Sequence, residues 1–305
     1  MSKKILFFGN ERLATGVTTT APALRGLIAA GYEIAAIIVA QNDMAKSRKA
    51  RPLEVAEIAK KHDIPLIAPV DLLAVKDTLA AYGAQAAVLV AYGKIVPPAV
   101  LEIFPSGIIN IHPSLLPLYR GSTPIESAIL ESNYETGVSL MKLSAKMDAG
   151  PVYDQSPFYM AGMTKQQSAD ALAERGTALL LKHLPKILGK TPAAARPQDK
   201  SSATYTKLIT KQDGLIDWQK SAERLEREIR AYAGWPRSRT TISGKDVIIT
   251  KARVSDRVGP PGTFKNESGR LLAFCKRGAL EIESLVPAGK KEMRAKDFLA
   301  GHSSL

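Results

Sequence analysis

Cysteine is nearly absent from this sequence: Cys275 is the only one in 305 residues. A single cysteine cannot form an internal disulfide and cannot by itself hold a metal ion, so disulfide-stapled and zinc-dependent classes of protein have little support. We expect a buried and inert thiol at this position.

Long apolar segments are missing as well. The longest runs, such as residues 34–40 and 84–92, fall far below the roughly 18 residues that a membrane helix requires. The initial Met-Ser-Lys-Lys is followed by only five apolar residues and no small-residue cleavage site, unlike a secretory signal. These features predict a protein that has no membrane partner and works in the cytoplasm.

Acidic residues are in deficit, and this gives the first indication of function. Lys and Arg outnumber Asp and Glu by 42 to 29, for a net charge of +13, and residues 205–305 carry +8 of it. Such an excess suggests a polyanionic partner such as nucleic acid, although a solvated basic surface is the plainer alternative. The length favours two domains, each large enough to bury a core, so a monomer is expected.

The first 190 residues alternate between apolar strands and amphipathic helices. Strands are expected at residues 5–8, 34–39, 64–67, 86–91, 108–111, 138–143 and 152–159, and helices at 20–30, 52–62, 72–82, 98–104 and 164–188. Because the strands are apolar throughout, they predict a parallel α/β sheet that is covered on both faces. Ligands of such sheets bind at the carboxyl ends of the strands.

The remaining sequence changes character after residue 189. Residues 190–204 are rich in Pro, Ala, Ser and charge without any period, which predicts a linker between an N-terminal domain (1–189) and a C-terminal domain (205–305). Beyond it, a helix at 221–232 and short strands at 238–242, 246–254, 271–274 and 279–285 predict a small β-barrel. An OB-like barrel is a common nucleic-acid-binding example.

Several familiar motifs are not satisfied. Residues 9–16 (GNERLATG) lack the G-x-G-x-x-G spacing of a dinucleotide site, so a nicotinamide cofactor has no support. Residues 189–191 (GKT) lack the upstream glycine of a phosphate-binding loop, and no G-x-S-x-G elbow is present.

One polar constellation stands out. Asn110 and His112 are two apart on a predicted strand, so their side chains lie on one face and can converge on one atom. Pro113 and Pro117 then stiffen the following loop. Asp148 lies in a turn after a later strand, and it reaches the same crevice if the two strands are neighbours. The alternative is that His112 ends a strand and Asp148 merely makes a turn.

These residues resemble the signature of the N10-formyltetrahydrofolate-dependent formyltransferases, which is Asn-x-His-x-Ser-Leu-Leu-Pro followed by an Asp-x-Gly turn. Residues 91–97 (AYGKIVP), together with Ile216-Asp217-Trp218, Trp235-Pro236 and the motifs at 289–293 and 297–298, resemble the branch of that family that acts on methionyl-tRNA. The resemblance spans nearly the whole chain. It implies a Rossmann-like catalytic domain and a smaller C-terminal OB-like domain that binds tRNA.

The resemblance also implies roles for the polar constellation. Formyl transfer to an amine passes through a tetrahedral intermediate with a negative oxygen, which needs hydrogen-bond donors. Asn110 and His112 are expected to donate to that oxygen. Asp148 is expected to orient His112 and to accept the proton of the amine, directly or through a water.

Further residues receive binding roles by the same resemblance. The cosubstrate is 10-formyltetrahydrofolate, no metal is implied, and the second substrate is initiator methionyl-tRNA. Residues expected to line the folate site are Ser114, Leu115, Leu116 and Pro117, with Tyr92, Gly93, Ile95 and Pro97 closing over the pterin. In the loop at 41–51 the family's usual Pro-Ala-Gly-Arg-Gly pattern is absent, but basic residues expected to meet tRNA are kept: Lys46, Arg48, Lys49 and Arg51. The loop at 9–12 also departs from the family pattern, which leaves its role open.

Two other functions remain open at this point. A formyltransferase acting on an amino-sugar nucleotide would share Asn110, His112 and Asp148. A non-catalytic RNA-binding protein with a decayed formyltransferase domain is the alternative from another class, although a binding module has no need to keep all three residues.

Overall fold

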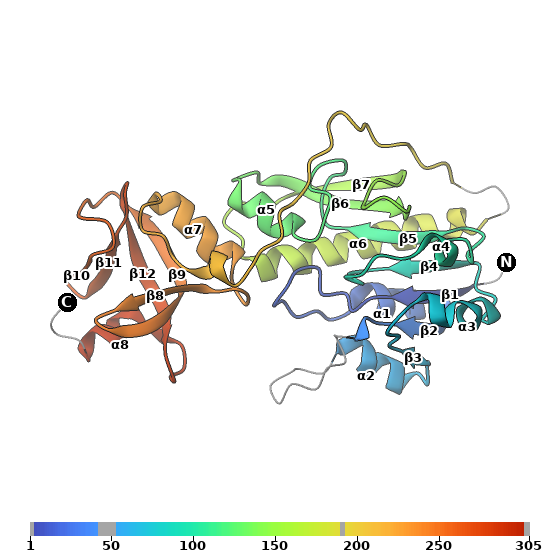
Figure 1. Cartoon of the computed structure of the whole chain (residues 1–305), viewed down its shortest axis with the longest axis horizontal. Helices are drawn as coiled ribbons and strands as arrows, with labels where there is room; N and C mark the ends of the chain where they lie inside the picture. Colours follow the sequence, from blue (N-terminus) through green and yellow to red (C-terminus); the bar gives the residue numbers. More distant parts are fainter. Residues whose placement is uncertain (1–2, 42–52, 190–192, 302–305) are drawn as a thin grey trace. The chain divides into compact units, whose positions relative to one another are not determined.

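The computed structural model describes residues 3–41, 53–189 and 193–301 (Figure 1). It divides into two compact units. The first comprises residues 1–124, 134–161 and 167–207, and the second comprises residues 125–133, 162–166 and 208–305. Two short segments of the predicted N-terminal domain, 125–133 and 162–166, thus belong to the second unit. The predicted domain boundaries stay a prediction.

A seven-stranded sheet forms the first unit, in the order β3-β2-β1-β4-β5-β6-β7. Its strands are β1 (Lys4–Phe8), β2 (Glu33–Ile38), β3 (Leu66–Ile67), β4 (Ala86–Leu89), β5 (Ile108–His112), β6 (Glu135–Lys142) and β7 (Val152–Tyr159). Strands β1 to β5 are parallel to one another, as predicted, and the Rossmann-like α/β fold class is confirmed. The last two strands depart from the prediction, since β6 is antiparallel to both β5 and β7. The connection between β6 and β7, residues 143–151, makes them a hairpin.

Helices cover both faces of this sheet (Figure 1). They are α1 (Pro22–Ala29), α2 (Glu54–Lys61), α3 (Lys76–Ala81), α4 (Pro98–Leu101) and the long α6 (Lys165–Ile187), with a short 3-10 helix at Leu73–Val75. Burial on two sides is visible in β1, where every residue from Ile5 to Phe8 is 0% exposed. This explains why the strands lack polar alternation.

The packing of α6 fixes which way β5 faces. A Cβ on Gly176 of α6 would lie 2.4 Å from Cγ2 of Ile111, so the helix approaches this strand at a position where only glycine fits. Ile108 belongs instead to the core cluster that contains Phe8, Val100 and other residues near α4. Because side chains alternate along a strand, Asn110 and His112 share the face of Ile108, opposite α6.

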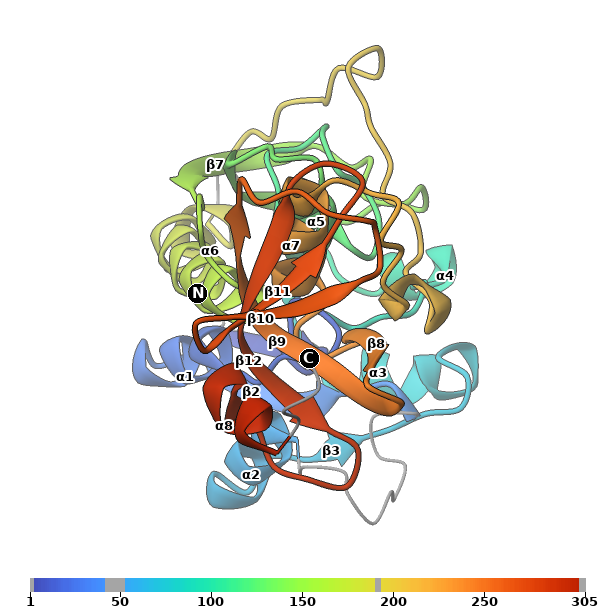
Figure 2. The same cartoon turned by 90° about the vertical axis from the view of Figure 1, so that its left-hand side faces the viewer.

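The second unit contains a six-stranded antiparallel sheet in the order β10-β11-β12-β9-β8, with β13 paired to β12 (Figure 2). The strands are β8 (Ser238–Ile242), β9 (Lys245–Ser255), β10 (Phe264–Glu267), β11 (Arg270–Phe274), β12 (Ala279–Pro287) and β13 (Met293–Arg294). Helices α7 (Ala222–Ala231) and α8 (Ala295–Ala300) pack their apolar residues into its core. The predicted smaller C-terminal β domain is therefore confirmed, and its sheet is antiparallel throughout.

Cys275 is 3% exposed within this core. Burial raises the pKa of its thiol to about 11, which keeps it protonated at neutral pH. The predicted burial of this thiol is confirmed. The raised pKa agrees with the predicted lack of reactivity.

Buried polar contacts hold residues 125–133 and 162–166 in the second unit. Lys165, at the start of α6, donates to the Trp235 carbonyl (2.8 Å) and lies 3.5 Å from Oε1 of Glu126 in helix α5 (Pro124–Leu130). Arg224 and Arg227 of α7 both donate to the Leu130 carbonyl at the end of α5. Helix α5 thus has charged partners at both of its ends. No helix among the described residues is both long and apolar enough to cross a membrane.

Candidate active site

Strand β5 presents Asn110 and His112 on one face, and each residue is 5% exposed. Within the described residues the side-chain amide of Asn110 has no hydrogen-bond partner. Buried polar groups are nearly always paired, so an amide in this position is available to a ligand. The convergence of these two side chains follows directly from their spacing of two.

His112 is held by one ring nitrogen and faces a carboxylate with the other. Its Nε2 lies 3.0 Å from the Tyr119 carbonyl oxygen, and because a carbonyl can only accept, Nε2 carries the proton. Nδ1 lies 3.7 Å from Oδ2 of Asp148, which is an ion-pair distance rather than a hydrogen bond. The carboxylate of Asp148 therefore faces the ring edge that carries Nδ1.

Asp148 reaches this site by an unexpected path. Strand β6 runs antiparallel to β5 and ends with Lys142 opposite Ile109, several residues before His112. The turn after β6 must therefore return along the sheet for Asp148 to meet His112. Asp148 adopts a left-handed conformation (φ 46°) and its Oδ2 accepts a 2.8 Å hydrogen bond from the Gly121 amide. The neighbouring-strand argument thus led to the right contact although the strands are antiparallel.

The loop at 114–117 is fixed by two polar residues of the neighbouring strands. The Ser139 hydroxyl of β6 donates to the Ser114 carbonyl and accepts from the Leu116 amide and from Gln155 of β7. Gln155 also donates to the Leu116 carbonyl. Ser139 thus uses one donor and two acceptors, which is the full capacity of a hydroxyl.

Residues predicted to line the folate site differ in what they can offer. Ser114 is fully buried and its hydroxyl donates to the Leu118 carbonyl (2.6 Å), so that hydroxyl serves the loop itself. Leu116 is 5% exposed, whereas Leu115 and Pro117 are half-buried and can present apolar surface. Their contact with folate stays a prediction.

The segment at 92–97 leaves the sheet beside Asn110, since Leu89 of β4 pairs with Asn110 of β5. Tyr92 is a core residue whose ring meets Phe8 edge-on at 5.6 Å. Ile95 is 78% exposed, and Gly93 has open space where a side chain would stand. Pro97 precedes α4 at its N-cap position. An exposed isoleucine beside an uncovered glycine suits an aromatic ring, but the ring of Tyr92 is already committed to the core.

The predicted tRNA-contacting residues cannot be placed in this way. Lys46, Arg48, Lys49 and Arg51 all lie outside the described residues.

Glu11 shows what the unusual first loop does. It is 1% exposed, and its two carboxylate oxygens accept the Ala23 and Leu24 amides at 2.9 and 2.7 Å. It therefore caps the N-terminus of α1 from a distant loop. Burial, opposed by those two hydrogen bonds, raises the pKa of Glu11 to about 7.

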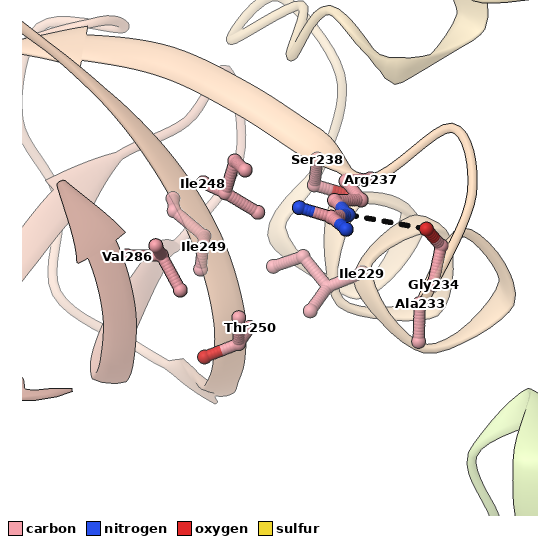
Figure 3. Close-up of a pocket in the computed structure, with 9 residues that line it drawn as sticks. All are labelled: Ile229, Ala233, Gly234, Arg237, Ser238, Ile248, Ile249, Thr250 and Val286. Carbon is pink, nitrogen blue, oxygen red and sulfur yellow. Dashed lines mark hydrogen bonds between the residues drawn. The ribbon is translucent and has the colours of Figure 1, made fainter. Parts of the chain in front are cut away.

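A pocket of about 260 Å³ lies in the second unit (Figure 3). Its walls are mostly apolar, including Ile229, Ile248 and Val286, and Arg237 at its rim donates to the Gly234 carbonyl. It contains none of the predicted site residues. Across the described ranges no group of three or more His, Cys, Asp or Glu side chains is arranged to hold a metal ion.

The fold and the site together are those of an α/β enzyme. An amide and an imidazole lie on strand β5, and a carboxylate from the turn after β6 faces the imidazole. Residues 4–187 match the family model "Formyl transferase", and residues 208–303 match "Formyl transferase, C-terminal domain". The chain belongs to the formyl transferase family.

Individual proteins show the same relationship. Methionyl-tRNA formyltransferase of Chloroflexus aurantiacus is 39% identical, with 98% of this chain and 96% of that protein covered. The N-formyltransferase of Helicobacter canadensis, solved with folinic acid and dTDP-3-aminofucose, has a TM-score of 0.68 at 18% identity, covering 92% of this chain and 99% of that one. HypX from Aquifex aeolicus, in complex with tetrahydrofolic acid, has a TM-score of 0.66 at 16% identity, and 98% of this chain spans only 47% of its length.

Proposed function

We propose that this chain transfers the formyl group of 10-formyltetrahydrofolate to the free amino group of initiator methionyl-tRNA. The product is N-formylmethionyl-tRNA for translation initiation. The observation that carries the proposal is the meeting of His112 and Asp148 beside the unpaired amide of Asn110. The relative named methionyl-tRNA formyltransferase, similar over nearly its whole length, supports the choice of acceptor.

The geometry assigns a role to each of the three side chains. As the amine attacks the formyl carbon, the carbonyl oxygen becomes negative, and the Asn110 amide donates to it. Nε2 of His112 is occupied by the Tyr119 carbonyl, so Nδ1 is the ring nitrogen through which His112 would act on the same oxygen. Asp148, 3.7 Å from Nδ1, orients the ring.

Proton transfer completes the reaction. The attacking amine loses a proton to Asp148, directly or through a water. The bond from the formyl carbon to N10 of the folate then breaks, and N10 takes up a proton so that tetrahydrofolate leaves. Asp148 suits this task because its side chain is 15% exposed and Oδ2 is already fixed by the Gly121 amide.

Substrate binding rests on the flanking segments. Leu115, Pro117, Gly93 and Ile95 offer exposed or half-buried apolar surface at the carboxyl end of β4 and β5 for the pterin of the cosubstrate. The net charge of +13 supports a tRNA acceptor, to which Lys46, Arg48, Lys49 and Arg51 would contribute. We further propose 205–305 as the tRNA-binding domain.

Incubation with 10-formyltetrahydrofolate and aminoacylated initiator tRNA tests the proposal. Formyl-methionine recovered after hydrolysis of the tRNA ester is the expected result. An amino-sugar nucleotide is the second candidate acceptor, because the Helicobacter canadensis protein has the same fold. Formylation of such a sugar without any formylation of the tRNA would overturn our proposal, and formylation of neither would leave only a basic binding protein.

A further inference from the structure

The segment predicted as a linker is in part bound to the candidate active site. After α6 the chain runs back over the side of the sheet that carries β6 and β7 (Figure 1). We call residues 196–206 the strap. Arg196 pairs with Val152 through two 2.8 Å backbone hydrogen bonds. The Arg120 amide donates to the Thr204 carbonyl, and the Arg120 carbonyl accepts from the Thr206 amide. The Thr204 hydroxyl also accepts the Tyr119 amide.

Gln198 is the residue of the strap that reaches the Asp148 turn. Its Nε2 donates to the carbonyls of Asp148 (2.8 Å) and Gly150 (2.7 Å). Its Oε1 accepts from Nε (3.1 Å) and Nη2 (2.8 Å) of Arg120. An amide has two N–H donors, and both are used here. If the Gln198 amide were turned by 180°, its NH₂ would face the Arg120 guanidinium and its oxygen would face the carbonyls of Asp148 and Gly150. Neither contact is a hydrogen bond, so the orientation of the amide is fixed.

Arg120 connects the Gln198 amide to the loop that holds His112. It is 3% exposed, and its remaining Nη1 donates to the Tyr205 hydroxyl of the strap. Its two neighbours contact the site directly. Tyr119 offers its carbonyl to His112, and Gly121 donates its amide to Asp148. Three consecutive residues therefore hold His112, Gln198 and Asp148.

The Asp148 turn needs such support because little else restrains it. It lies outside regular secondary structure, Asp148 is in a left-handed conformation, and Met147 is 59% exposed. A non-glycine residue in that conformation persists only where its surroundings impose it. Hydrogen bonds from Gln198 on both sides of Ala149 and from Gly121 to the carboxylate provide that constraint.

We propose that Gln198 and Arg120 are positioning residues that hold the carboxylate of Asp148 against His112, so that the strap is part of the active site. This inference rests on the proposed function, because it assigns Asp148 a role in turnover. It predicts that the strap sets the rate of the chemical step rather than the binding of either substrate.

The substitution Gln198→Glu separates positioning from general stability. The glutamate keeps the acceptor for Arg120 and adds charge to that bond, but it replaces two donors with an oxygen that faces the Asp148 and Gly150 carbonyls. We expect kcat to fall about 10 to 100-fold, the penalty of a displacement of about 1 Å, with KM for both substrates within about threefold. Gln85→Glu, just before β4 at the edge of the sheet opposite the site, is the matched control and should leave both parameters unchanged.

A double-mutant cycle with Asp148→Ala gives the decisive readout. If Gln198 acts through Asp148, then Gln198→Glu should cost little further turnover once the carboxylate is gone. Gln198→Met, which removes all four hydrogen bonds, is taken through the same cycle in case the glutamate variant does not fold. Additive losses, a loss confined to KM, or unchanged kcat would each overturn the positioning role. Full turnover in Asp148→Ala alone would instead refute the proposed catalytic assignment.

Discussion

The ring of His112 has only one nitrogen available for catalysis. Nε2 is committed to the Tyr119 carbonyl, and Nδ1 points towards Asp148. The Asn110 amide, two residues earlier on the same face, is the second donor. Groups from other parts of the chain hold His112, whereas the Asn110 amide has no partner within the described residues.

Asn110 should therefore be needed for rate and not for stability. We expect Asn110→Ala to lower kcat about 100 to 1,000-fold, the usual penalty for removing one oxyanion donor. Asn110→Asp, which has the same shape but cannot donate, should be at least as impaired. Thermal unfolding of Asn110→Ala should change little, because no described residue loses a hydrogen bond. Near-normal kcat in the aspartate variant would contradict the donor role.

Glu11 predicts a pH dependence of stability. Its pKa is about 7 in the folded protein, against an ordinary value of 4.5 for a solvated glutamate, so the folded state binds the proton more tightly than the unfolded chain does. Its contribution is complete below about pH 4.5 and is lost as pH rises through 7, a change of about 3 kcal/mol. The free energy of unfolding of the parent minus that of Glu11→Gln should therefore fall from pH 5 to pH 8. Urea denaturation at each pH measures this difference. A difference that rises with pH would contradict this sign.

At this scale the sequence was informative where spacing decides and silent where long-range contact decides. Asn110 and His112 share a face because they are two apart on a strand. Gln198 could not be found in this way, because its partners at 120, 148 and 150 are brought to it only by the folded chain.

Among the elements, the turn between β6 and β7 is the most sensitive to side-chain volume. A Cβ on Gly150 would lie 1.9 Å from the Lys142 carbonyl oxygen. Gly150→Ala must displace the turn, and with it both the Gln198 contact and the Asp148 carboxylate. We expect a loss of about 1 to 3 kcal/mol of stability and a reduced kcat. Gly301→Ala, whose nearest atom is 3.8 Å away, is the matched control. Equal behaviour of the two variants in denaturation and kinetics would refute the argument.

Ser139 makes a separate prediction about the loop at 114–117. Ser139→Ala leaves the Ser114 carbonyl and the Leu116 amide without their buried partner, at about 1 to 3 kcal/mol for each unpaired group. Since this loop is proposed to line the folate site, KM for 10-formyltetrahydrofolate should rise while KM for tRNA is unchanged. Ser156→Ala on β7, whose hydroxyl has only a 3.4 Å contact with Arg175, serves as control. An unchanged folate KM would show that the loop does not contact folate.

The elements themselves were predictable where they are buried and apolar. All seven strands of the first sheet were expected, but the direction of β6 was not, because direction depends on how a connection runs and not on the strand's own composition. The short α5, β10, β13 and α8 were missed, since few residues give little periodicity. Composition predicted a linker at 190–204, and the described part of it has no helix or strand, but composition could not reveal the isolated bridges that bind this segment to the first unit.

For the whole molecule, the excess of positive charge predicts a strong salt effect. If about six or more phosphates are contacted, kcat/KM for tRNA should fall about 1,000-fold or more between about 50 and 200 mM salt. Replacing Lys46, Arg48, Lys49 and Arg51 by alanine should flatten that dependence, whereas alanine at Lys60 and Lys61 of α2 should not. KM for the folate should hardly respond to salt. A salt dependence that is equal in all three proteins would remove the 41–51 segment from the tRNA interface.

The most direct test of the central claim offers both acceptors at once. Isotope-labelled 10-formyltetrahydrofolate is supplied with equal amounts of aminoacylated initiator tRNA and an amino-sugar nucleotide, to the parent protein and to Asp148→Ala. We predict label on the amino group of the tRNA-bound methionine and a decrease of about 100-fold or more in the variant. Label on the sugar, or equal labelling of the tRNA by both proteins, would contradict our account.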